Sequence, residues 1–131
     1  MTSHNCFAYG SLMYEPIMAT VSAQKCAGIP ATLEGYSRHA LQGEDYPGMV
    51  AEAGGKIAGI LYRGLPATAI ARLDDFEGAQ YLRTQVIVRT GDGSAIHAEA
   101  YVLRPEYAHL LLPGDWDYAH FLAEGRQRFQ R

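Results

Sequence analysis

The chain has 131 residues, of which 48% are hydrophobic and 19% charged, and its net charge is −3. This length and composition predict one globular domain, residues 1–131, with a buried core. The sequence has no basic run, which argues against a nucleic acid partner, and no apolar stretch approaches the roughly 18 residues of a membrane span.

Short apolar segments separated by glycine and proline predict most of the secondary structure in the first part of the chain. Residues 14–22 fit a short helix with Pro16 in its first turn. Residues 29–41 fit one strand or a bent pair of strands, with Gly35 as the expected bulge. The predicted strands cover residues 6–10, 29–41, 56–64, 81–89 and 94–104.

Three further segments complete the chain. Residues 44–55 predict a Pro-Gly loop, a short strand and then a Gly-Gly turn. The stretch TGDG, residues 90–93, predicts a hairpin turn between two strands. Residues 115–130 predict a terminal helix, for which Asp115 is the candidate N-cap.

The order of these elements indicates the fold class. Strands outnumber helices and occur in runs around one central helix, which predicts an α+β fold with a largely antiparallel or mixed sheet. The 14 glycines suit a sheet that curls into a small barrel.

The central helix, residues 66–77, has an acidic residue on its apolar side. Proline suits the first turn of a helix and glycine the position after its end, so PATAIARLDDFEG predicts a helix with defined ends. Ile70, Leu73 and Glu77 stand at i, i+3 and i+7 and share one face. Asp75 falls on the solvent side, and Asp74 lies at the edge of the apolar stripe.

Two interpretations of Glu77 follow. The last turn of a helix often frays, so this carboxylate is in the first interpretation structural or half-exposed. In the second, it is a partly buried carboxylate whose pKa is raised because burial disfavours its charged form. Such a carboxylate can take up and return a proton near neutral pH, which is general acid–base catalysis.

The segment FAYGSLM supplies a second candidate feature. A strand leads to Tyr9, and Gly10, Ser11 and Leu12 then turn tightly before the next helix. Successive backbone N–H groups in such a turn can bind a carboxylate or a phosphate. The motif is common and by itself usually binds nothing, and it lacks the GxSxG pattern of a nucleophilic serine.

Taken together, these segments resemble the gamma-glutamylcyclotransferase-like family, which includes the gamma-glutamylamine cyclotransferases. The resemblance is carried by YGSL near the start of the chain and by LDDFEG followed by YLR about 65 residues later. The YPGMV segment between these motifs and the AEAYVL strand after them extend it over nearly the whole chain.

The resemblance implies a small mixed β-barrel with peripheral helices, and a reaction that cyclises a γ-glutamyl group to 5-oxoproline and releases an amine or amino acid. It implies a small-molecule γ-glutamyl substrate and no metal or organic cofactor. Glu77 would be the catalytic acid–base. The residues implied to bind or adjoin the substrate are Tyr9, Gly10, Ser11, Leu12 and Tyr101.

Other polar residues have less specific interpretations. The two cysteines, Cys6 and Cys26, lack CxxC spacing, and a reduced cytoplasmic pair is a simpler interpretation than a disulfide. The histidines lack ligand spacing such as HxxxH, and three nearby acids on different helix faces make a poor cation cage, so we expect no metal. Arg83 is expected to form a structural ion pair with Asp74, with carboxylate binding as the alternative.

The loop with Tyr46 and Pro47 has two interpretations. It either covers the pocket or is a surface turn.

A second functional class is possible, because fold alone does not decide function. The alternative to a cyclotransferase is a non-catalytic module that binds a small carboxylate or a γ-glutamyl ligand. A module that binds acids gains nothing from a second negative charge in its pocket, so Glu77 favours the enzyme.

Overall fold

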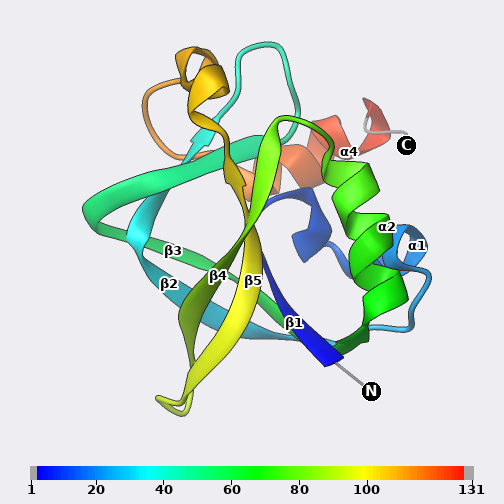
Figure 1. Cartoon of the computed structure of the whole chain (residues 1–131). Helices are drawn as coiled ribbons and strands as arrows, with labels where there is room; N and C mark the ends of the chain where they lie inside the picture. Colours follow the sequence, from blue (N-terminus) through cyan, green and yellow to red (C-terminus); the bar gives the residue numbers. More distant parts are fainter. Residues whose placement is uncertain (1–2, 129–131) are drawn as a thin grey trace.

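The computed structural model describes residues 3–128 of the chain. The expected α+β class is confirmed, with five strands in one mixed sheet and helices outside it (Figure 1). The strands are β1 (Ser3–Ala8), β2 (Gly28–Ala40), β3 (Pro47–Pro66), β4 (Tyr81–Thr90) and β5 (Ala95–Leu103).

The sheet closes on itself. Its strand order is β1-β3-β2-β4-β5, and all neighbours in that order are antiparallel. The first and last strands, β1 and β5, meet in parallel at Cys6 and Glu99, which completes a closed barrel. As a result, β5 is brought beside the strand that leads into residues 9–12.

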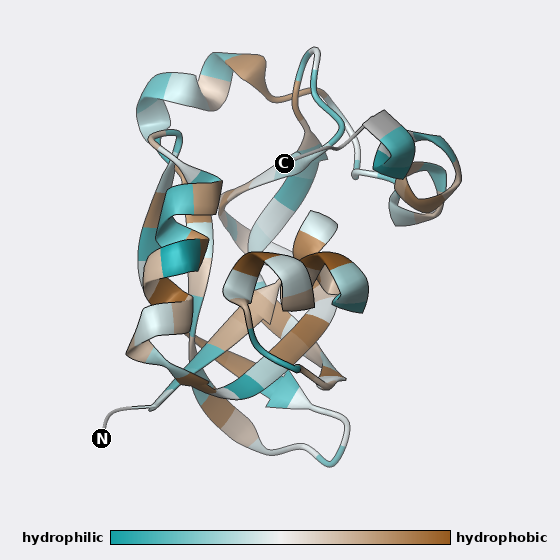
Figure 2. Cartoon of the chain, turned by 90° about the vertical axis from the view of Figure 1, so that its right-hand side faces the viewer, coloured by the Kyte–Doolittle hydropathy of each residue, from teal (hydrophilic) through white to brown (hydrophobic). Residues whose placement is uncertain are grey.

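Helices α1 (Glu15–Ser22) and α2 (Ala67–Glu77) lie on the same side of the sheet and contact each other (Figure 1). Figure 2 views this side and shows hydrophilic residues on the outer surface of α2. The remaining elements are the short helices α3 (Tyr118–His120) and α4 (Arg126–Arg128), a π-helical turn (Phe121–Gly125), and the 3-10 turns Ser11–Met13 and Pro105–Leu110. No helix within residues 3–128 is long and apolar enough to cross a membrane.

The prediction for α2 is confirmed almost to the residue. Pro66 is its N-cap, and Gly78, with a φ of 78°, follows its last residue. That left-handed φ is one that glycine adopts without steric cost. Ile70 and Leu73 are buried, as their spacing predicts, and they pack in a cluster that includes the outward-facing Cys6 of β1.

A second apolar cluster fills the inside of the closed sheet. It takes residues from all five strands, among them Phe7 of β1 and Val88 of β4. Phe7 and Cys6 belong to different clusters because successive side chains of a strand point to opposite faces. The helices are therefore held on the outer surface of a sheet whose interior is independently packed.

The prediction for residues 44–55 is wrong in two respects. The loop expected at Pro47 and Gly48 is instead the start of β3, where both residues pair with β2, and the Gly54-Gly55 turn does not divide two strands, because β3 runs continuously from Pro47 to Pro66. The turn is absorbed as an irregularity, since Glu34 pairs with Lys56 whereas Tyr36 pairs with Ala51. Residues 52–55 of β3 thus stand opposite a single residue of β2, which is Gly35, the predicted bulge.

The predicted C-terminal helix is present, but its start and its N-cap differ from the prediction. Helix α3 begins at Tyr118 and is capped by Asp117, whose carboxylate accepts from the His120 N–H at 3.1 Å. Asp115 is not the N-cap, because its carboxylate binds Arg38 instead. The helical path then passes through the π-helical turn to α4, and residues 129 and 130 of the predicted helix lie outside the described residues.

Candidate functional site

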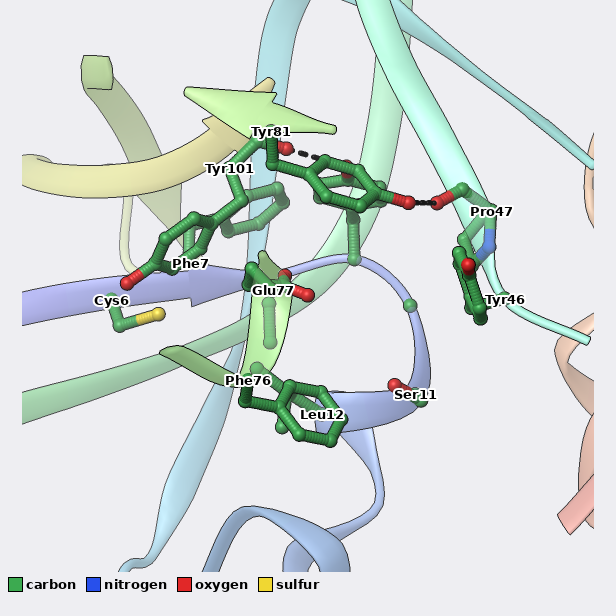
Figure 3. Close-up of a pocket in the computed structure, with 13 residues that line it drawn as sticks. Cys6, Phe7, Ser11, Leu12, Tyr46, Pro47, Phe76, Glu77, Tyr81 and Tyr101 are labelled. Carbon is green, nitrogen blue, oxygen red and sulfur yellow. Dashed lines mark hydrogen bonds between the residues drawn. The ribbon is translucent and has the colours of Figure 1, made fainter. Parts of the chain in front are cut away.

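One cavity brings together residues from the start of the chain, the end of α2, the start of β3 and strand β5. It opens to solvent, and the space between its atoms, with the solvent at its mouth included, is about 470 Å³. All six residues singled out from the sequence line it (Figure 3). They are Tyr9, Gly10, Ser11, Leu12, Glu77 and Tyr101. The rest of the lining is Cys6, Phe7, Ala8, Tyr46, Pro47, Phe76 and Tyr81.

The turn formed by residues 9–12, here called the Gly10 turn, forms one wall. Its first residue, Tyr9, is buried, and its hydroxyl donates to the backbone carbonyl of Tyr101 at 2.5 Å. Burial raises the pKa of the Tyr9 phenol well above its ordinary value. The hydrogen bond from the Tyr9 hydroxyl therefore links the Gly10 turn to β5.

The second half of the turn is a single 3-10 turn. The Met13 N–H donates to the Gly10 carbonyl at 2.9 Å, and the Tyr62 hydroxyl donates to the Leu12 carbonyl at 2.7 Å. The amides at the start of a helical turn have no acceptor within that turn. Those of the Gly10 turn, together with the buried Ser11 hydroxyl, are suited to bind an anionic group.

Arg38 of β2 holds the Gly10 turn from behind, and sequence reasoning missed it. Its guanidinium donates to the Tyr9 carbonyl at 2.8 Å and binds both carboxylate oxygens of Asp115, at 2.7 and 3.0 Å. It also lies 5.6 Å from the centre of the Trp116 ring. The hydrogen bonds from Arg38 lower the pKa of Asp115 below its ordinary value. No local motif marks Arg38, because its partners are distant in the sequence.

Glu77, the last residue of α2, stands opposite the Gly10 turn. Its side chain is half-buried, and Figure 3 shows the carboxylate directed into the space between Tyr81 and that turn. Ile70 and Leu73 fix the rotation of the helix, so the last residue of the same stripe faces the cavity. The raised pKa expected for Glu77 stays a prediction.

The third wall is formed by Tyr101 on β5. It is buried, and its hydroxyl donates to the Asp74 carboxylate at 2.8 Å. Burial and, secondly, the bond to Asp74 raise the pKa of the Tyr101 phenol. The predicted ion pair between Arg83 and Asp74 is confirmed, with a nitrogen–oxygen distance of 3.7 Å, and Arg83 also approaches Glu99 at 3.4 Å.

The start of β3 and the residue before it form a further wall of the cavity. Of the two interpretations of Tyr46 and Pro47, the structure favours a pocket wall, since both residues line the cavity. The Tyr81 hydroxyl donates to the Pro47 carbonyl at 2.7 Å and fixes this segment to β4. Tyr81 was not predicted as a pocket residue.

Cysteine and metal chemistry have little support at this site. Both cysteines are free thiols, so the disulfide alternative is wrong. Cys6 lines the cavity, but burial and, secondly, the charge of Glu77 raise its pKa, which leaves little reactive thiolate. Among residues 3–128, no group of three acidic, histidine or cysteine side chains is arranged to hold a metal ion.

Comparisons with known proteins identify the family and similar folds. The sequence matches the family model described as "Gamma-glutamyl cyclotransferase, AIG2-like" over residues 6–118. Protein AIG2 C of Arabidopsis thaliana is 33% identical over 129 residues, which are 97% of this chain and 77% of the relative. The solution structure of an A. thaliana protein superposes with a TM-score of 0.76 at 28% identity, covering 98% of this chain and 78% of that one. A solved gamma-glutamyl cyclotransferase shares the fold, with a TM-score of 0.69 at 18% identity over 81% of this chain and 74% of that one.

Proposed function

The chain belongs to the gamma-glutamyl cyclotransferase, AIG2-like family, and we propose that it cyclises a γ-glutamyl amine or γ-glutamyl amino acid to 5-oxoproline. Membership of this family supports an enzyme of the cyclotransferase type. The finer proposal includes Glu77 as the general acid–base, no cofactor and a cytoplasmic location. The observation that carries it is that the Glu77 carboxylate and the Gly10 turn face each other across one cavity.

The proposed reaction needs no nucleophile from the protein. The α-amine of the γ-glutamyl group attacks its own γ-carbonyl carbon, because both groups lie in one molecule. The Glu77 carboxylate takes a proton from the α-ammonium, a carbon–nitrogen bond forms, and the carbonyl oxygen becomes an oxyanion. The protonated Glu77 then donates to the leaving nitrogen and the original amide bond breaks. The ring nitrogen gives its remaining extra proton to the released amine through the Glu77 carboxylate, which leaves 5-oxoproline, an ammonium product and an ionised Glu77.

The other cavity residues have binding roles in this proposal. Amides of the Gly10 turn and the Ser11 hydroxyl hold the substrate's α-carboxylate, which places the negative charge away from Glu77. Leu12 and Tyr9 shape the floor of the pocket. Tyr101 contacts the glutamyl group beside Glu77, where its ring lines the cavity. Holding the substrate folded brings the amine and the carbonyl within reach of each other.

The experiment that tests this proposal is a 5-oxoproline release assay. The panel comprises γ-glutamyl amino acids, γ-glutamyl-ε-lysine and a γ-glutamyl alkylamine, each with the wild type, Glu77→Gln and Asp75→Asn. Loss of general acid–base catalysis costs about 10²- to 10⁴-fold in rate, so Glu77→Gln should lower turnover by at least that range. Asp75→Asn removes an exposed acid from the same helix and is the matched control.

The same variants separate the alternatives. A functional carboxylate can be removed with the free energy of unfolding unchanged or increased. A large loss of stability in Glu77→Gln would instead indicate a structural carboxylate with essential partners. Binding of γ-glutamyl ligands without turnover of any substrate would favour the non-catalytic binding module.

A further inference from the structure

The mouth of the cavity is formed by the residues of its lining that are half-exposed. They are Gly10, Tyr46, Phe76 and Glu77, whereas the rest of the lining is buried. In the proposed reaction the γ-glutamyl group lies between the Gly10 turn and Glu77, so the leaving group of the substrate has to extend through this mouth. Gly10 has no side chain, and Glu77 is the proposed acid–base. The rings of Tyr46 and Phe76 are therefore the surfaces that the leaving group can contact.

Tyr46 is held so that its ring, and not its hydroxyl, is available to a ligand. The hydroxyl donates to Glu44 Oε2 at 2.5 Å and lies 3.3 Å from Gln80 Oε1. Neither Glu44 nor Gln80 lines the cavity, so the hydroxyl is engaged outside it. The Tyr46 ring lies 6.5 Å from the Tyr81 ring, centre to centre, and Figure 3 shows it on the side of the Gly10 turn. An aromatic ring at this position can pack against a carbon chain.

The charges of the lining do not favour a second carboxylate on the substrate. Among the 13 residues that line the cavity, all within the described part of the chain, Glu77 is the only acid and no lysine, arginine or histidine is present. The amides of the Gly10 turn are assigned to the substrate's own α-carboxylate. Arg38, behind that turn, binds Asp115 at 2.7 and 3.0 Å. A leaving amino acid would bring its carboxylate to the mouth beside Glu77, where it would lose water without gaining a cation from the lining.

We propose that Tyr46 and Phe76 form the leaving-group subsite, and that Tyr46 is a specificity-determining residue that favours a carbon chain over a carboxylate next to the leaving nitrogen. This inference rests on the proposed function. It narrows the substrate class to γ-glutamyl amines in which the carbon attached to the leaving nitrogen carries no carboxylate. The chain of such an amine packs on the two rings, and the burial of its apolar surface favours binding.

Two substrates that differ in a single carboxylate test this subsite. γ-Glutamyl n-propylamide and γ-glutamyl-α-aminobutyrate have the same carbon chain, and only the second carries a carboxylate beside the leaving nitrogen. The measured quantity is the specificity ratio, which is kcat/KM for the first substrate divided by kcat/KM for the second. For the wild type it should be about 10 to 100, the range for a polar group that is buried without a partner. A ratio near one would overturn the proposal.

Variants at Tyr46 assign the specificity to this residue. Tyr46→Ala removes the ring and admits water to the mouth, so it should lower the specificity ratio by about tenfold or more. Tyr46→Phe keeps the ring and should leave the ratio unchanged, because the hydroxyl is engaged outside the cavity. Tyr36→Ala is the matched control, since Tyr36 is also half-exposed and does not line the cavity.

The comparison of ratios is independent of how much of each variant is folded. The active fraction of a preparation and the intrinsic reactivity of the two amides both cancel when the ratios of variant and wild type are compared. A purely structural role of Tyr46 would lower kcat/KM equally for both substrates in Tyr46→Ala, and that result would overturn the proposal.

A spectroscopic measurement keeps the subsite separate from the proposed function. It uses the Glu77→Gln variant labelled with ¹³C at the tyrosine ζ-carbon, in which the Tyr46 resonance is identified by its loss in Tyr46→Phe. γ-Glutamyl n-propylamide should move this resonance more than L-glutamine does, because glutamine is the γ-glutamyl amide without the carbon chain. An equal response to both compounds, or none, would overturn the subsite. A wild type that releases no 5-oxoproline from γ-glutamyl n-propylamide or from any other γ-glutamyl compound would instead refute the proposed function.

Discussion

Gly10→Ala perturbs the candidate site at its tightest contact. A Cβ atom at this position would lie 2.8 Å from Pro47 Cδ and 2.9 Å from Pro47 Cγ. Carbon atoms pack best at about 3.5–4.0 Å, so the Gly10 turn and Pro47 must separate by about 0.7 Å or more. The Pro47 ring is rigid, and its carbonyl is held by the Tyr81 hydroxyl at 2.7 Å, so this wall yields poorly.

The magnitude follows from that overlap. Adding one methyl group to a well-packed site typically costs about 1–3 kcal/mol, and we expect Gly10→Ala to lower the free energy of unfolding by this amount. A misplacement of about 1 Å in a binding site can cost about a hundredfold in rate. The displaced Gly10 turn should therefore lower kcat/KM for a γ-glutamyl substrate by about tenfold or more.

Urea unfolding and the 5-oxoproline assay measure the two effects on the same protein. Gly91→Ala is the matched control, because a Cβ at Gly91 meets no atom within 4 Å. It should change neither the stability nor kcat/KM. An alanine at residue 10 that left both quantities within error of the wild type would refute the close packing of the Gly10 turn against Pro47.

Two further predictions concern ionisable groups. The pKa of Asp115 is lower in the folded state than in the unfolded state, where it is about 3.9, so the bond to Arg38 stabilises the fold above that pH. The contribution disappears as pH falls through the folded-state pKa of Asp115. Because the Asp115 side chain is 64% exposed, Asp115→Asn should lower the free energy of unfolding by about 1 kcal/mol or less at pH 7, measured by urea unfolding. At strongly acidic pH the substitution should have no effect. An equal loss of stability at both pH values would contradict this prediction. The raised pKa of Cys6 predicts that the half-buried Cys26 reacts first with iodoacetamide at pH 8. Mass spectrometry measures the rate at which each cysteine is modified. Modification of Cys6 as fast as Cys26 would contradict the burial of Cys6.

The features that could be predicted from the sequence depend on neighbours in the chain. Pro66 and Gly78 mark the ends of α2, and the spacing of Ile70 and Leu73 places Glu77 on the buried side. The bulge at Gly35 follows from the backbone freedom of glycine. These predictions succeed because a helical period and a backbone preference act within a few residues.

The wrong predictions concern partners that are distant in the sequence. Asp115 has the composition of an N-cap, but a bidentate bond to Arg38 of β2 takes its carboxylate. The Gly54-Gly55 pair has the composition of a hairpin turn, but β2 continues to pair with β3 on both sides of it. In both cases a tertiary contact competes with a local preference, and the tertiary contact prevails.

The sequence by itself determined the fold class, the face of α2 that carries Glu77 and, through resemblance, the six residues of the candidate site. Only the tertiary structure decided that these residues line one cavity, that Tyr46, Pro47 and Tyr81 close it, and that Asp74 accepts a hydrogen bond from the Tyr101 hydroxyl. The physical reason is that closure of the sheet brings β1 beside β5 and α2 over both, and the pairing of distant strands leaves no periodic signal in the chain.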